Sequence, residues 1–226
     1  MLEIKGFLET SFVDWPGKIC SVLFLPHCNL RCPYCHNHGL VLHPGLYSTL
    51  SLRNTLNRLL SFRGWIDGVC ISGGEPTLHA DLPSLMEKIK RLGFLVKLDT
   101  NGSNPRLLER LVAERIVDFV SMDVKAPLNA IRYSRIAGTT VSLNRIWESI
   151  RFLKRGVVEY EFRTTVVPGL HSSHDILRLG QQLRAGSRMT LQDFNPENPM
   201  DSSLKETRPL GPERLRELER RVQGMM

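Results

Sequence analysis

The feature that most restricts the fold is an alternation of short apolar runs with amphipathic helix patterns, which repeats about six times along the chain. The runs have the length of buried strands, and we predict strands at residues 19–25, 68–72, 94–98, 116–122, 157–167 and 189–194. Helix patterns lie between them, with predicted starts at Ser51, Pro105 and Ser142. This order predicts parallel βαβ units with helices outside the sheet. An eight-unit barrel needs about 250 residues, so the 226-residue chain predicts an α/β fold with a partial, TIM-like (β/α)6 barrel.

Composition and charge limit the classes of partner. The chain is 42% hydrophobic and 23% charged, as expected of one soluble globular domain. Its net charge is +7, but Lys and Arg are scattered and interleaved with acidic residues, as in residues 213–221. No apolar run reaches the length that crosses a bilayer. We therefore predict neither nucleic acid nor a membrane as a partner.

Polar residues follow or interrupt several predicted strands. They are Ser72-Gly73-Gly74-Glu75-Pro76, Asp99 with Thr100, Asp123 with Lys125, and Arg163. Two adjacent glycines let a backbone approach a ligand, although an ordinary strand-to-helix turn is the alternative. Arg163 either extends along the strand toward solvent or points inward to bind an anion. Because chemistry in parallel α/β folds gathers at the carboxyl ends of the strands, these residues predict a site there.

Three of the five cysteines, Cys28, Cys32 and Cys35, lie in one short loop after the first predicted strand. Such a loop can bring three thiolates to one soft metal centre, whereas a closed zinc or iron-sulfur site usually takes four protein ligands. Cys20 and Cys70 lie in apolar runs, and we predict that they are buried strand residues. The loop therefore predicts a metal centre with one open coordination position, where a small molecule can react.

The cysteine loop has alternative interpretations. One of His27, His36 and His38 could complete a structural zinc site with the three cysteines. A disulfide framework is disfavoured, because the number of cysteines is odd, the chain can build a core, and no apolar signal segment precedes residue 20. We therefore predict reduced thiols and a cytoplasmic protein.

The loop also resembles a known family. The pattern Cys28-Asn-Leu-Arg-Cys32-Pro-Tyr34-Cys35, followed by His-Asn, resembles the cluster loop of radical S-adenosylmethionine (SAM) enzymes. The lead-in Phe-Val-Asp-Trp-Pro-Gly at residues 12–17 and the Cys-His-Asn ending resemble the activating enzymes of glycyl-radical enzymes. The likeness is greatest to the activating protein of anaerobic ribonucleoside-triphosphate reductase. It implies a single radical SAM domain over residues 1–226, with a core at about 7–195 and a C-terminal loop and short helix at 196–226.

The resemblance implies two cofactors. Cys28, Cys32 and Cys35 would bind three irons of a 4Fe-4S cluster, and SAM would chelate the fourth iron through its amino and carboxylate groups. An electron from the reduced cluster would cleave SAM into methionine and a 5′-deoxyadenosyl radical, so that the cofactors carry the difficult chemistry. The electron would come from a donor such as flavodoxin or ferredoxin.

The resemblance also implies which residues bind SAM. The Gly73-Gly74-Glu75 motif would hold its amino group, Lys125 and Arg163 would face its carboxylate or ribose, and the backbone of Tyr34 would face the adenine unless Tyr34 only packs beside the cluster. Asp99, Thr100 and Asp123 match positions that hold a monovalent cation beside the SAM carboxylate in pyruvate formate-lyase activating relatives. Asn195 stands where some relatives have a histidine near the adenine.

The predicted function is that of an enzyme, a radical SAM activase that generates a glycyl radical on a partner. The partner expected from the resemblance is the anaerobic ribonucleoside-triphosphate reductase. Alternatives within radical chemistry are the activation of another glycyl-radical enzyme, such as pyruvate formate-lyase, or a small-molecule reaction like that of the deazapurine carboxylate synthases. A non-enzymatic alternative is an iron-sulfur carrier or a zinc-binding protein.

Overall fold

The computed structural model, which describes residues 2–183 and 188–224, contains one seven-stranded sheet whose strand order follows the chain. The strands are β1 (Gly6–Ser11), β2 (Cys20–Leu25), β3 (Gly68–Gly73), β4 (Leu95–Thr100), β5 (Phe119–Asp123), β6 (Glu159–Val166) and β7 (Met189–Asp193). Strands β2 to β7 are parallel, and β1 is antiparallel to β2 at one edge. In the described part of the chain β1 does not pair with β7, so the sheet is not closed. The predicted partial barrel with six parallel strands is confirmed.

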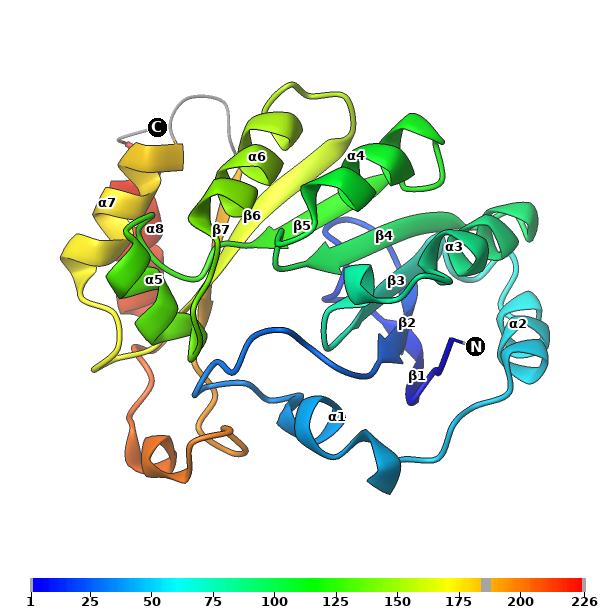
Figure 1. The fold of residues 1–226 in the computed structure, drawn as a ribbon, viewed down its shortest axis with the longest axis horizontal. Helices are drawn as coiled ribbons and strands as arrows, with labels where there is room; N and C mark the ends of the chain where they lie inside the picture. Colours follow the sequence, from blue (N-terminus) through cyan, green and yellow to red (C-terminus); the bar gives the residue numbers. More distant parts are fainter. Residues whose placement is uncertain (1, 184–187, 225–226) are drawn as a thin grey trace.

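The helices lie between strands or follow the last strand, and several of them cover the outer side of the sheet. They are α1 (His38–Leu42), α2 (Leu52–Leu60), α3 (Leu82–Arg91), α4 (Pro105–Ala113), α5 (Ala130–Ala137), α6 (Leu143–Leu153), α7 (Ser173–Leu183) and α8 (Pro212–Gln223), with 3-10 turns at Pro44–Leu46, Pro76–Leu78 and Ser202–Glu206. Figure 1 shows α3, α4 and α6 lying along the same side of the strands. The predicted start at Ser51 is confirmed in detail, because its side chain accepts a hydrogen bond from the backbone N–H of Asn54. Among the described residues, no helix combines the length and apolar character that a membrane crossing requires.

The two faces of the sheet differ in chemistry. On the face toward the helices, alternate strand residues such as Leu23, Ile71 and Val120 are fully buried in the main core. The opposite, inner face carries a small apolar cluster at the amino ends of the strands, made of Trp15, Cys20, Val22, Cys70 and Phe119. Toward the carboxyl ends this same face becomes polar. The burial predicted for Cys20 and Cys70 is thus confirmed.

Three helices or strands were not predicted from the sequence, namely β1, α1 and α5, and α1 is only five residues long. Strand β1 carries no apolar run, because most of its residues are exposed or half-buried at the sheet edge. Helix α5 is only eight residues long, and its sequence Ala-Ile-Arg-Tyr-Ser-Arg-Ile-Ala has a weak apolar pattern. In addition, the tail that the sequence predicts as a loop contains the 3-10 turn at Ser202–Glu206. In each case the pattern was too short or too polar to indicate an element.

Helix α5 ends against the cysteine loop. The backbone N–H of Arg31 donates to the carbonyl of Ala137 at 2.8 Å, and Gly138 follows in the left-handed conformation with φ of +67°. A Cβ atom at Gly138 would lie 1.9 Å from the carbonyl oxygen of Arg31. The close backbone contact therefore requires glycine at this position, and it fixes one side of the loop.

We predict that Gly138→Ala destabilises the protein and perturbs the cysteine loop. The left-handed conformation costs a non-glycine residue about 1–2 kcal/mol, and the clash with Arg31 adds to this cost. The matched control is Gly156→Ala, since Gly156 has φ of +68° but nothing within 4 Å of its added Cβ. Urea unfolding and iron content after anaerobic reconstitution measure the effects. Equal losses of stability and iron in both variants would contradict the prediction.

Candidate active site

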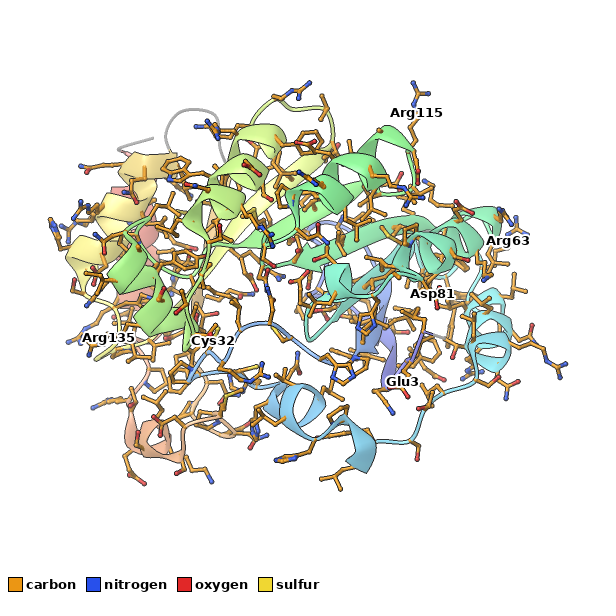
Figure 2. The ribbon with its side chains drawn as sticks, viewed as in Figure 1. Glu3, Cys32, Arg63, Asp81, Arg115 and Arg135 are labelled. Atoms are coloured by element: carbon orange, nitrogen blue, oxygen red, sulfur yellow. The ribbon has the colours of Figure 1, made fainter. Side chains whose placement is uncertain are left out.

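One pocket lies where the cysteine loop meets the carboxyl ends of the parallel strands. Its volume is about 240 Å³, and all twelve residues predicted for the cluster and SAM line it. These are Cys28, Cys32, Tyr34, Cys35, Gly73, Gly74, Glu75, Asp99, Thr100, Asp123, Lys125 and Arg163. Figure 2 shows Cys32 on the loop before α1, close to α5. The structure therefore brings together residues from the cysteine loop and from four strands or the turns that follow them.

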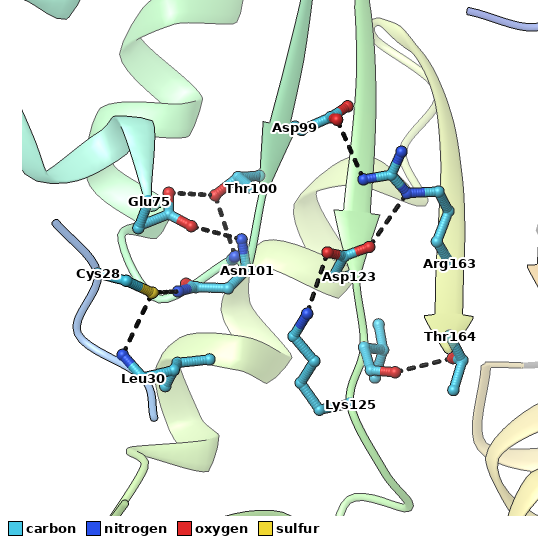
Figure 3. Close-up of polar contacts among 12 residues, drawn as sticks. Cys28, Leu30, Glu75, Asp99, Thr100, Asn101, Asp123, Lys125, Arg163 and Thr164 are labelled. Atoms are coloured by element: carbon cyan, nitrogen blue, oxygen red, sulfur yellow. Dashed lines mark hydrogen bonds and ion pairs between the residues drawn. The ribbon is translucent and has the colours of Figure 1, made fainter. Parts of the chain in front are cut away.

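The cysteine sulfurs lie in a buried environment with N–H donors nearby. Cys28 Sγ accepts from the backbone N–H of Leu30 at 3.3 Å and from the side-chain amide of Asn101 at 3.9 Å (Figure 3). Burial raises the pKa of the Cys28 thiol to about 12, and it raises those of Cys32 and Cys35 as well. Hydrogen bonds to sulfur and restricted solvent access are two of the means by which proteins adjust an iron-sulfur cluster.

The donor set fits a 4Fe-4S cluster better than the alternative zinc site. Within the described ranges, no three Cys, His, Asp or Glu side chains are grouped closely enough to hold a single metal ion. A cluster does not require such a group, because each cysteine binds a different iron. The Tyr34 hydroxyl is buried near the Cys32 sulfur and favours its thiolate form, which is the form that binds iron.

The paired glycines lie against the protein's own backbone. The N–H of Gly74 donates to the carbonyl of Leu25 at 2.8 Å, and the N–H of Glu75 donates to that of His27 at 2.7 Å. A Cβ at Gly74 would lie 1.8 Å from the His27 carbonyl oxygen, and one at Gly73 would lie 2.4 Å from that of Leu25. The close approach that these glycines permit in the structure is that of the backbone of Leu25 and His27, which leads into the cysteine loop. Their contact with SAM stays a prediction.

The side chain of Glu75 is committed to internal hydrogen bonds. It is 1% exposed and accepts from Thr77, from the Thr100 hydroxyl at 2.7 Å and from the backbone N–H of Asn101 at 2.7 Å (Figure 3). Burial outweighs these bonds and raises the pKa of its carboxyl. Among the described residues, Oε2 accepts only from the backbone N–H of Asn101, so this oxygen retains acceptor capacity. The contact of Glu75 with the SAM amino group stays a prediction.

Two carboxylates and three cations form a buried ion-pair network beside the pocket. Arg163 lies between the carboxylates, with Nη2 3.2 Å from Asp99 Oδ2 and Nε 3.1 Å from Asp123 Oδ1. Lys97 pairs with Asp99 Oδ1, and Lys125 pairs with Asp123 Oδ2 at 3.0 Å. Figure 3 shows Arg163 reaching from β6 toward both carboxylates, and Lys125 on the other side of Asp123.

This network keeps both carboxylates ionised. Burial alone raises the pKa of Asp99, but Arg163 and Lys97 outweigh it and leave the pKa below its usual value. Burial likewise raises the pKa of Asp123, and Lys125 with Arg163 reverses the shift. Of the two predictions for Arg163, the inward orientation is right and extension toward solvent is wrong, because its side chain is only 13% exposed.

The predicted monovalent cation meets a different arrangement from the one expected. The resemblance predicts a cation beside the SAM carboxylate, where it would keep Asp99 and Asp123 from repelling that anionic ligand. In the structure the guanidinium of Arg163 pairs with both carboxylates, and Thr100 donates its hydroxyl to Glu75. The presence of a cation stays a prediction.

Other residues of the site were missed or placed differently. Lys97 and Asn101 were not identified, because a lysine in an apolar strand and an asparagine in a turn carry no distinctive pattern. Asn37 donates its side-chain amide to the Gly73 carbonyl at 3.0 Å and so supports the paired glycines. Asn195 does not line the pocket; its amide bonds to Glu197, and Gln192 contributes from β7 instead.

The fold and site together define a class of protein. A partial barrel that presents a three-cysteine loop and a polar pocket at the carboxyl edge of its sheet is suited to an iron-sulfur cluster with a small molecule beside it. The family model described as the radical SAM superfamily matches residues 22–179. The chain belongs to the radical SAM superfamily, and its cofactors are accordingly a 4Fe-4S cluster and SAM.

Curated relatives indicate which members of the superfamily this chain resembles. A protein of Methanocaldococcus jannaschii named as a glycyl-radical enzyme activating enzyme, MJ1227, is 32% identical over 207 residues, covering 89% of this chain and 84% of that protein. The pyruvate formate-lyase 1-activating enzyme of Escherichia coli K12 is 29% identical over 192 residues, covering 80% and 75%. The resemblance to activating enzymes is thereby confirmed, and an enzyme is favoured over a carrier or zinc protein.

Solved structures agree on the fold. A radical SAM methyltransferase from Sphaerobacter thermophilus superposes with a TM-score of 0.65 at 17% identity, covering 96% of this chain and 66% of that one. TYW1 with a lysine-pyruvate adduct superposes with a TM-score of 0.63 at 16% identity, covering 91% and 73%. At such low identity these likenesses show the fold alone.

We predict that Asp123 contributes acid-sensitive stability. Its folded pKa is lowered, so its ion pairs stabilise the fold above the ordinary aspartate value of about 3.9, and this stabilisation is lost as the pH falls below that value. Asp123→Asn should lower the free energy of unfolding at pH 7 by about 1–3 kcal/mol and reduce the further loss between pH 7 and pH 3.

Urea unfolding of cluster-free protein at the two pH values measures this effect. Glu109→Gln on the exposed face of α4 serves as the control, and it should change the unfolding free energy by less than about 0.5 kcal/mol. If Asp123→Asn lost as much stability on acidification as the unsubstituted protein, the assigned role of Asp123 would be wrong.

Proposed function

We propose that this chain is an activase that generates a glycyl radical on a partner enzyme, and that the partner is the anaerobic ribonucleoside-triphosphate reductase. The observation that carries the proposal is one pocket that combines the three-cysteine loop, the Gly73-Gly74-Glu75 motif and the Asp99-Arg163-Asp123 network. Relatives named as activating enzymes of glycyl-radical enzymes support the same reading. The lead-in at residues 12–17 and the Cys-His-Asn ending support an activase, and the greater likeness to the activating protein of anaerobic ribonucleoside-triphosphate reductase supports the choice of partner.

The chain's own residues would hold and shield the reaction site. Cys28, Cys32 and Cys35 would bind the cluster, and the N–H groups of Leu30 and Asn101 would stabilise negative charge on the Cys28 sulfur. When bound, the cluster and SAM supply the electron transfer and carbon-sulfur bond cleavage that the protein cannot perform alone.

The remaining pocket residues would orient SAM. Lys125 and Arg163 would face an anionic or hydroxyl group of the ligand, because both are cationic and line the pocket. The carbonyl of Gly73, held by Asn37, and the free acceptor capacity of Glu75 would receive its amino group. Tyr34 would present its backbone at the same pocket.

We also propose that residues 1–226 act as one radical SAM domain in the cytoplasm, with a core at about 7–195 and a C-terminal segment at 196–226. Residues 1, 184–187 and 225–226 lie outside the described residues. The unclosed sheet supports access for a glycine-bearing loop of the partner, because a closed barrel would restrict entry. An external donor such as flavodoxin or ferredoxin would reduce the cluster.

Pyruvate formate-lyase is the second candidate partner. It is favoured by one specific observation, the 29% identity to the Escherichia coli enzyme that carries its name. The two candidates differ only in the protein on which the radical forms, so a single assay with both partners separates them.

We predict that the reduced, cluster-loaded protein mixed with SAM and the anaerobic ribonucleotide reductase of its own organism gives the doublet of a glycyl radical in an electron paramagnetic resonance spectrum. Cys32→Ala should abolish the doublet, because Cys32 lines the pocket as one of only three proposed cluster ligands. Cys20→Ala is the matched control, since Cys20 is buried in β2 away from the pocket and should leave the signal intact.

The outcomes are distinct. A doublet only with pyruvate formate-lyase would replace the proposed partner and keep the activase. Cleavage of SAM that depends on a purine-like small molecule, with no protein radical on either partner, would contradict the activase and favour a small-molecule enzyme. Zinc without iron, and no binding of SAM, would contradict radical chemistry altogether.

A further inference from the structure

Lys97 is a buried cation that the proposed function does not use. It lies on β4, two residues before Asp99, and its side chain has no exposed surface. Its ammonium group pairs with Asp99 Oδ1 and lies 3.8 Å from Cys70 Sγ. It does not line the pocket, although Asp99, Asp123, Lys125 and Arg163 all do. Removing a charged group from water costs free energy, and Lys97 has no access to a ligand in the pocket. Its role is therefore to be sought in its contact with Asp99.

The network has a regular distribution of charge. Each carboxylate has one cation of its own, Lys97 for Asp99 and Lys125 for Asp123, and the two share Arg163. Three cations therefore contact two carboxylates. Glu161, which also faces the inner side of the sheet, accepts from the hydroxyls of Ser121 and Thr190 and makes no ion pair with this group among the described residues.

The three cations differ in their access to the pocket. Lys97 is held beneath it by β3 and β4, whereas Arg163 reaches it from β6 and retains 13% exposure of its side chain. If Arg163 moved toward a bound anion, Asp99 would keep Lys97 and the hydroxyl of Ser72, which donates to Oδ2 at 3.0 Å. Without Lys97, the same movement would leave a buried carboxylate with only that hydroxyl, which is strongly unfavourable.

We propose that Lys97 is a positioning residue that frees Arg163 to bind the carboxylate of SAM. Lys97 holds Asp99 from below, so Arg163 exchanges its contact with Asp99 for the ligand carboxylate without leaving Asp99 unpaired. On the other side of Arg163, Lys125 keeps Asp123 paired when Arg163 moves. This inference rests on the proposed function, because it takes SAM as the ligand, and it adds a residue that never touches that ligand.

Two ligands separate this role from a general structural one. SAM carries the carboxylate, whereas 5′-methylthioadenosine keeps the adenine, the ribose and the methyl-bearing sulfur, which is a neutral thioether instead of a sulfonium, but lacks both the amino and the carboxylate group. In cluster-loaded protein, Lys97→Met should weaken equilibrium binding of SAM by about tenfold or more, which corresponds to about 1.4 kcal/mol. Its affinity for 5′-methylthioadenosine should stay within about twofold, since that ligand makes no demand on Arg163.

The chain offers a matched control and a rescue. Lys90→Met removes another lysine that pairs with an aspartate, Asp118 at 2.7 Å, but outside the pocket, and it should change neither affinity. Lys97→Arg retains the charge and should keep SAM affinity closer to that of the unsubstituted protein than Lys97→Met does. Should Lys97→Met fail to fold, Lys97→Gln removes the charge with a polar side chain and is measured against the same two ligands.

Each result decides the matter. Unchanged SAM affinity in Lys97→Met, or an equal loss for both ligands, would overturn the role of Lys97 and leave the proposed function standing. Failure of the unsubstituted, cluster-loaded protein to bind SAM would overturn the proposed function and this inference together. A loss confined to SAM and restored by arginine is the result that supports it.

Discussion

The contact on which the site depends is the backbone pairing between the end of β3 and the segment that enters the cysteine loop. Gly74 and Glu75 donate to the carbonyls of Leu25 and His27, at distances that leave no room for a Cβ on Gly74. The same turn is tied to β4, because Glu75 accepts from Thr100 and Asn101. The cysteine loop and the Gly73-Gly74-Glu75 turn are therefore joined directly by backbone hydrogen bonds, and the turn is joined to β4 through Glu75.

A second constraint is the change of chemistry along the inner face of the sheet. Near the amino ends of the strands this face packs Trp15 against Phe119, with ring centroids 6.0 Å apart, and near the carboxyl ends it carries the ion-pair network. The parallel register places Asp123 beside Arg163 and Cys70 beside Lys97. Buried charges are tolerated only when they are paired. A shift in the register of the strands would separate these pairs, so the buried charges favour the observed register.

Much of the fold could be predicted from local patterns, because the parallel strands are buried apolar runs and the helices are amphipathic. β1 could not, since an edge strand with exposed residues leaves no apolar signal, and α5 could not, since it is short and is stabilised by its contact with Arg31. The sequence also predicted that the site residues lie close together, because the carboxyl ends of parallel strands lie at one edge of the sheet. What local patterns could not give is pairing across the sheet, so Arg163 between Asp99 and Asp123, and Lys97 beneath them, emerge only from the structure.

The protonation state of the three loop cysteines is coupled to the ion-pair network. Burial raises the pKa of Cys28 to about 12 and acts in the same direction on Cys32 and Cys35, so in the cluster-free chain at neutral pH these thiols are protonated. Iron binds the thiolate, and cluster assembly must therefore release protons. Lys125 favours the thiolate forms of all three cysteines, and its own positive charge is secured by Asp123. The ion pair between Lys125 and Asp123 thus keeps Asp123 ionised and also holds a positive charge near the three sulfurs, where it would favour the loss of their protons if they bind the cluster.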